Sequence, residues 1–141
     1  MESMISKETL QALIPQKAPF VMVDALYRFG ENALTAGLTV TEGNIFTTEG
    51  KFTEPGIVEH MAQSVALYTG YQYYLKQEQA PTGYIGSIKE VSITRLPENG
   101  EKLVTTVSVL QEFMGITLVD IVTSINNEPI AKSQMKTVLA K

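Results

Sequence analysis

Two adjacent ionisable residues, Glu59 and His60, stand at the start of the segment 55–77. After them the chain carries no formal charge until Lys76. A surface helix carries charged residues on its solvent face, so a helix over 55–77 is expected to be covered by protein on most sides. Ionisable groups are seldom buried without a partner or a function. Glu59 and His60 are therefore the first candidates for acid–base chemistry.

The helical repeat brings small and polar residues beside Glu59. Gln63, Ala66 and Gly70 follow it at spacings of three and four, so a carboxylate and an amide can share one surface beside a narrow apolar slot. His60 lies about 100° further around the helix. A neighbouring stripe is predicted to face a sheet, and it consists of Val58, Met61, Ala62, Val65 and Thr69.

Both ionisable residues also have ordinary structural interpretations. With Gly56 as N-cap, Glu59 is the third helical residue, where a carboxylate stabilises the helix terminus. A lone histidine is more often a packed or solvated residue than a catalyst. The sequence leaves these alternatives open.

Composition narrows the class of protein. The chain has 141 residues, 44% of them hydrophobic, which suits one domain over 1–141. The net charge of −4 comes without a basic cluster, which argues against nucleic-acid binding. With no cysteine and a single histidine, thiolate and histidine-rich metal sites are excluded. We expect a cytoplasmic protein with no signal peptide, membrane span, metal or cofactor.

The rest of the chain is predicted to be mostly β-structure. A short helix over 6–13 starts at Ser6 as N-cap. Segment 42–54 is expected to be irregular. Turn residues separate the predicted strands, which are 20–29, 34–41, 83–94, 101–113, 116–125 and 129–140.

One long uncharged helix among long strands predicts an α+β fold in which an antiparallel sheet curls around the helix. A single sheet cannot cover all sides of a helix. A second subunit is the simplest cover for the remaining face, so we expect a dimer.

Several segments resemble the hotdog-fold β-hydroxyacyl-[acyl-carrier-protein] dehydratases. The helix motif EHMAQ at 59–63 is similar to the central-helix motif of that family. The flanking segments agree in order: IPQKAPFVMVD at 14–24, YIGSIK at 84–89, PENGEKL at 97–103 and NEPIAKS at 127–133. The resemblance covers nearly the whole chain.

The resemblance implies a hotdog fold and dehydration of β-hydroxyacyl thioesters, on acyl-carrier protein or coenzyme A, to trans-2-enoyl thioesters in fatty-acid or polyene-type synthesis. Glu59 matches the family glutamate that acts on the hydroxyl. Amides of Gly56 and Ile57 would polarise the thioester carbonyl. Gln63 would orient groups beside Glu59, and Gly86 would let substrate pass near a strand.

One departure concerns the catalytic histidine of a His-Phe-Pro-Gly segment. The corresponding stretch, 48–53, reads TEGKFT and has no histidine. This pattern resembles a divergent subgroup associated with aryl-polyene and flexirubin-type pigments. His60 is a candidate substitute base, if the acyl slot runs between subunits. Asp24 is expected to be a structural hydrogen-bond acceptor, and Lys51 to be solvated.

Two other functions stay open. A hotdog acyl thioesterase would also use a helix carboxylate, and it tolerates the missing histidine. A non-catalytic acyl-binding partner subunit would form a mixed dimer with an active dehydratase, in place of a homodimer. Four basic residues could form a surface for an acidic carrier protein if the fold gathers them: Lys17, Arg28, Lys89 and Arg95.

Overall fold

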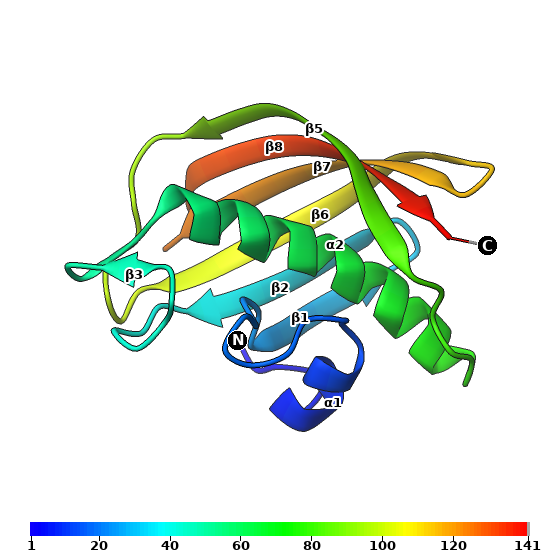
Figure 1. Ribbon diagram of the computed structural model, residues 1–141, viewed down its shortest axis with the longest axis horizontal. Coiled ribbons are helices and arrows are strands. Elements are labelled where there is room, and N and C mark those ends of the chain that lie inside the picture. Colours follow the sequence, from blue (N-terminus) through cyan, green and yellow to red (C-terminus); the bar gives the residue numbers. More distant parts are fainter. Residues whose placement is uncertain (141) are drawn as a thin grey trace.

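The computed structural model describes residues 1–140. Six antiparallel strands form one sheet in the order β1-β2-β6-β7-β8-β5. Their bounds are β1 Ala25–Gly30, β2 Ala33–Thr39, β5 Gly83–Ile93, β6 Lys102–Phe113, β7 Ile116–Ile125 and β8 Glu128–Leu139. The long helix α2, Glu54–Leu75, lies across one face of this sheet (Figure 1). This is the α+β arrangement that the sequence predicts.

The strand register places one face of the sheet against α2. Along β7 buried and partly exposed residues alternate, and the buried set includes Val119, Ile121 and Thr123. This alternation has the two-residue period of a strand with one covered face. Hairpin turns occur where predicted: Asn126 and Asn127 both adopt positive φ between β7 and β8, which suits a type I′ turn.

The helix begins earlier than the sequence predicts. Thr53 is the N-cap, and Pro55 lies in the first turn, where its missing N–H costs nothing. The expected Gly56 N-cap is therefore wrong, and Glu59 is the sixth helical residue, beyond the terminal turn in which a carboxylate caps the helix. Between Gly56 and Tyr73 no residue is fully exposed, which confirms that protein covers most of the helix.

The face of α2 that meets the sheet is rotated from the predicted one. Val58, Ala62 and Thr69 are only partly buried. Met61 and Val65 of the predicted stripe are buried as expected, and the buried row extends from them to Ile57, His60, Ser64, Leu67, Tyr68 and Tyr71. Polar His60 and Ser64 obscured this row in the sequence, because an apolar stripe was the signal for the buried face.

The remaining elements are short and flank the sheet. Helix α1, Lys7–Ala12, begins after Ser6, whose side chain accepts from the Thr9 N–H as predicted. β3, Thr47–Thr48, and β4, Lys51–Phe52, form a small hairpin inside the segment expected to be irregular. Strand β1 starts five residues later than predicted, because the backbone of 20–22 bonds to α2 side chains in place of a neighbouring strand. In residues 1–140 no helix combines the length and apolarity of a membrane span.

Candidate active site

Glu59 lies on the partly exposed side of α2 and is held by Gln63, one turn later. The Gln63 Nε2 donates to Glu59 Oε2 at 2.8 Å. Glu59 is half-buried, whereas Gln63 is fully buried. The predicted pairing of the two side chains on one surface is thus present, with the amide orienting the carboxylate.

Gln63 also connects the helix to the segment that precedes β1. Its Oε1 accepts from the Met22 N–H at 2.6 Å, and its Nε2 donates to the Phe20 carbonyl at 2.8 Å. Three hydrogen bonds leave the amide little freedom to rotate. The orientation of Glu59 therefore depends on where the 20–22 backbone lies.

His60 is a core residue of the sheet-facing row. Its ring is fully buried, with Nδ1 at 2.6 Å from the Met22 carbonyl oxygen and Nε2 at 2.7 Å from Thr105 Oγ1 on β6. Burial lowers its pKa from 6.5 to about 4, partly offset by the hydrogen bond to Met22. A ring with both nitrogens engaged and no solvent access does not fit direct proton transfer to a substrate, so the structure gives no support to His60 as the substitute base.

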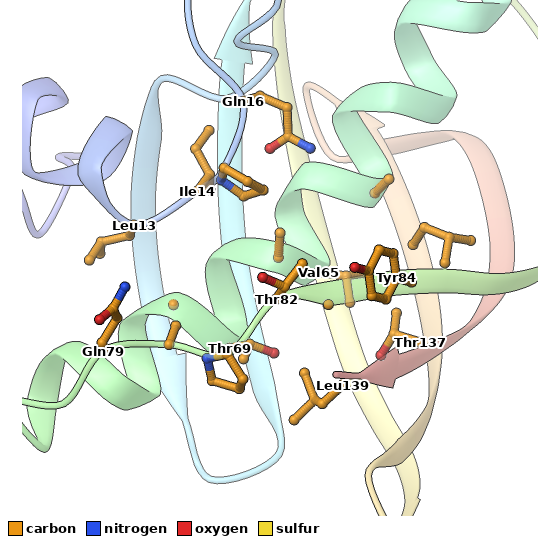
Figure 2. Close-up of a pocket in the computed structure, with 18 of the residues that line it drawn as sticks. Leu13, Ile14, Gln16, Val65, Thr69, Gln79, Thr82, Tyr84, Thr137 and Leu139 are labelled. Atoms are coloured by element: carbon orange, nitrogen blue, oxygen red, sulfur yellow. The ribbon is translucent and has the colours of Figure 1, made fainter. Parts of the chain in front are cut away.

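A pocket of about 300 Å³ lies beside α2, towards its C-terminal half (Figure 2). Three structural units enclose it: the small-residue face of α2, the segment 12–16, and the start of β5 with the end of β8. Residues from these units include Ala62, Val65, Ala66, Thr69, Gly70, Leu13, Ile14, Gln16, Thr82, Tyr84, Ile85, Thr137 and Leu139. The volume is at the lower end of the range for small-molecule sites.

The pocket begins one turn along the helix from Glu59. Ala62 and Ala66, three and seven residues after Glu59, project within about 60° of it and line the pocket. The predicted apolar slot is therefore present, but neither Glu59 nor the buried Gln63 lines it. The Gln16 Oε1 is buried without a partner among residues 1–140, and Gln16 lies at one end of the pocket (Figure 2).

Gly70 allows the 12–16 segment to approach the helix. A Cβ added there would lie 2.1 Å from the Leu13 carbonyl oxygen, a distance that real contacts do not reach. The residue is thus required for close backbone packing, and this packing forms one wall of the pocket.

The other predicted site residues, Gly56, Ile57 and Gly86, do not line the pocket. The Ile57 N–H donates to the Thr53 carbonyl at 3.1 Å within the helix. Gly56 is covered by Phe46 and Phe52, whose atoms lie 2.7 Å from a built Cβ. Gly86 is exposed at a bulge of β5, beside the pocket residues Tyr84 and Ile85.

The two residues with predicted structural roles behave as expected. Asp24 Oδ2 accepts from the Thr39 N–H at 2.9 Å, and burial raises the pKa of its carboxyl. Lys51 is exposed on β4. In residues 1–140 no three side chains of the metal-binding types His, Cys, Asp and Glu gather at one point.

The four basic residues do not form one surface. Arg28 is on β1 and Lys89 on β5, which are opposite edges of the sheet. Arg95 pairs with Glu101 at 2.9 Å. The fold therefore does not gather these charges into a carrier-protein surface within one chain.

Comparison with known proteins decides the family. Residues 8–140 match the ApeP-like family, described as ApeP dehydratase. The chain belongs to this family of dehydratases. It is also 26% identical over 133 residues to the 3-hydroxyacyl-[acyl-carrier-protein] dehydratase FabZ of Vibrio cholerae, covering 90% of this chain and 86% of that protein.

Solved structures support the hotdog fold. A chain of the dehydratase heterocomplex ApeI:P from Xenorhabdus doucetiae matches with a TM-score of 0.87 at 16% identity, over 94% of this chain and 91% of that one. A hypothetical thioesterase with coenzyme A from Streptococcus pneumoniae matches with a TM-score of 0.65 at 7% identity, over 82% and 84% of the two chains. The ApeP-like chain thus shares its fold with proteins of both named activities, and its family membership favours dehydration.

Sequence reasoning missed the backbone of Phe20 and Met22 and the hydroxyls of Thr105 and Thr123. Backbone groups leave no mark in a sequence. The threonines can be detected in the sequence. Thr105 and Thr123 occupy inward positions of strands in which buried and exposed residues alternate, and a polar residue at such a position needs a buried partner.

Proposed function

We propose that this chain supplies Glu59 to a two-subunit hotdog dehydratase that converts β-hydroxyacyl thioesters into trans-2-enoyl thioesters. The observation that carries the proposal is the contrast between two ionisable residues. Glu59 is half-exposed, oriented by Gln63 and one turn from a pocket, whereas the single histidine of the chain is sealed in the core.

The reaction divides naturally between two groups. A base removes the α-proton, the C–O bond at the β-carbon breaks, and an acid protonates the departing hydroxyl to give water. Glu59 is suited to the acid role. The chain offers no free imidazole for the base, so in this proposal the base belongs to a partner subunit.

The free edge of the sheet supports the presence of a partner. Ile88 on β5 pairs with buried Met135 on β8, so both residues project from the helix-facing side of the sheet. Yet Ile88 is 43% exposed and Ile85, further along the same strand, is 40% exposed. Apolar side chains that remain exposed on the inner face of an edge strand favour a second subunit over water.

The naming of one structural relative as a heterocomplex favours a related hotdog subunit over a second copy of this chain. The FabZ relative favours acyl-carrier protein as the carrier. The pocket beside Ala62 and Ala66 is suited to the apolar part of the acyl chain.

An enoyl-forming assay tests the proposal. The ApeP-like chain would be measured alone and co-expressed with a hotdog subunit of the same organism that carries a His-Phe-Pro-Gly segment. Substrates would be 3-hydroxyacyl thioesters on carrier protein and on coenzyme A, and free thiol would be measured in parallel. We expect enoyl product from the pair, loss of at least about a hundredfold in Glu59→Gln, and no loss in Glu54→Gln, an exposed carboxylate in the first turn of α2.

Each contrary outcome has a distinct meaning. Full activity of the pair with Glu59→Gln would make this chain a non-catalytic partner subunit. Full activity of the chain alone would contradict the proposal that a second, different subunit is required. Glu59-dependent thiol release without enoyl product would indicate a thioesterase.

A further inference from the structure

The buried His60 belongs to a continuous polar chain that crosses three elements. Its Nδ1 meets the Met22 carbonyl and its Nε2 meets Thr105 Oγ1. Thr105 Oγ1 lies 2.6 Å from Thr123 Oγ1 on β7. All three side chains are 0% exposed, so water does not compete for these bonds.

The partners determine the proton positions. A carbonyl oxygen only accepts, so Nδ1 must carry the ring proton. In the neutral ring Nε2 is then an acceptor, and the Thr105 hydroxyl must donate to it. The Thr105 oxygen in turn accepts from the Thr123 hydroxyl. No titratable side chain contacts the ring within residues 1–140, and burial without a counter-charge disfavours the cation.

Met22 connects the hydrogen-bonded groups His60, Thr105 and Thr123 to Glu59. Its carbonyl is bound by His60 and its N–H by Gln63 at 2.6 Å, so two helix side chains three residues apart hold one residue of the neighbouring segment. Gln63 then donates to Glu59 Oε2. A loss of the His60 bond frees the carbonyl side of Met22, and the Met22 N–H that donates to Gln63 and orients it becomes mobile.

The geometry points to His60 as a positioning residue: a neutral Nδ1–H imidazole, fixed by Thr105 and Thr123, that sets the orientation of Glu59 through Met22 and Gln63. The catalytic consequence rests on the proposed function, whereas the tautomer does not. Such a role differs from simple core filling, since it requires a particular proton on a particular nitrogen.

Nitrogen-15 NMR of the ring tests the tautomer directly. The chain has one histidine, so its imidazole signals are unambiguous. We expect the Nδ1–H form and no titration between about pH 5 and 8. An Nε2–H form, a mixture of the two, or a ring that titrates near its usual pKa would overturn the assignment.

Thr105→Val tests the link to catalysis, because it removes the donor to Nε2 while keeping the shape of the side chain. Thr106→Val on the same strand is the matched control, since Thr106 is exposed. In the active two-subunit assembly we expect Thr105→Val to lower kcat about tenfold with KM little changed, and the control to change neither. An unchanged kcat in a folded Thr105→Val protein whose ring has lost the single tautomer would refute the positioning role.

A second pair of variants separates donation from bulk. Asn at position 60 can place an amide N–H near the Nδ1 position, whereas Phe keeps the ring without a donor. We expect His60→Asn to retain several-fold more kcat than His60→Phe. The reverse order would show that ring packing matters and the hydrogen bond does not. If the wild-type assembly makes no enoyl product, the proposed function fails, but the NMR result still decides the tautomer.

Discussion

The Gln63 side chain donates a 2.8 Å hydrogen bond to Glu59 while the same amide holds the backbone of a segment about 40 residues earlier in the chain. The i, i+4 spacing makes the first contact available in any helix. The second contact forms only because the backbone groups of Phe20 and Met22 bond to a helix side chain and not to a neighbouring strand. The candidate acid is therefore oriented by tertiary structure.

Replacing Gln63 should weaken both stability and activity. Gln63→Leu leaves the Met22 N–H without a partner in the core and removes the donor to Glu59. An unpaired buried donor costs about 1–3 kcal/mol, so we expect the free energy of unfolding to fall by about that amount and kcat to fall with it. Urea unfolding and the enoyl assay measure the two effects.

Gln72→Leu is the matched control for this variant, because Gln72 lies on the same helix and makes only one long contact, 3.4 Å to Tyr68. Its effect should stay within about 0.5 kcal/mol. Equal effects of the two substitutions would show that the Gln63 network adds nothing beyond an ordinary helix position.

Gly70→Ala should have two opposite effects on stability, a gain from helix propensity and a loss from packing. In a helix interior, alanine is favoured over glycine by about 1 kcal/mol. The new Cβ would meet the Leu13 carbonyl at 2.1 Å, and backbone cannot rotate away as a side chain can. Overpacking of this kind costs about 1–3 kcal/mol or more, so we expect net destabilisation, measured by urea unfolding.

Gly43→Ala is the control for that substitution, since nothing lies within 4 Å of a built Cβ there. It should be nearly neutral. A Gly70→Ala protein more stable than the wild type would mean that the 12–16 segment can move off the helix without cost.

The sequence predicted the sheet, the hairpins and the central helix because these follow from local signals. Alternation defines β7, the Asn126-Asn127 pair defines a turn, and the uncharged run defines α2. The helix start was misplaced because Gly56 was preferred as the N-cap, although Thr53 is a favoured N-cap residue type and Pro55 follows it in the first turn. Its buried face was misjudged because that face contains His60 and Ser64, whose polarity is satisfied inside the core by long-range partners.

The candidate site was predicted only where it is local. Glu59 and Gln63 are neighbours by helix geometry alone. The partners of His60 come from positions 22 and 105, and no spacing rule connects them. The Gly70 contact similarly depends on Leu13, which is brought to the helix by tertiary packing.

Filling the pocket should change chain-length preference. Ala66 lines the pocket beyond Ala62 as the helix leads away from Glu59, so a leucine there should obstruct a long acyl chain and spare a short one. We expect Ala66→Leu to lower kcat/KM about tenfold for 3-hydroxydecanoyl thioesters, with little change for 3-hydroxybutyryl thioesters. Ala33→Leu, exposed on β2, adds the same volume elsewhere and should change neither. A uniform loss across chain lengths would show that the pocket does not hold the acyl chain.

The buried state of His60 should make the protein less stable in mild acid. Its pKa is lowered from 6.5 to about 4 in the folded state, so the unfolded chain binds a proton first as the pH falls. The stability of the folded state that depends on a neutral His60 is fully present above about pH 6.5 and is lost progressively as the pH falls towards 4. A difference of this size corresponds to roughly 3 kcal/mol. The Met22 carbonyl and the Thr105 hydroxyl contact the ring, and neither group titrates.

Urea unfolding at a series of pH values, for the wild type and His60→Asn, isolates this effect because both proteins share every carboxylate. The free energy of unfolding of the wild type should fall more steeply than that of the variant between about pH 6.5 and 4. Raised carboxyl pKa values, such as that of Asp24, contribute with the opposite sign, since they stabilise the folded state at low pH, but they cancel in the difference. Parallel curves for the two proteins would mean that the His60 ring can be protonated in the folded state, which would contradict its burial as a neutral imidazole.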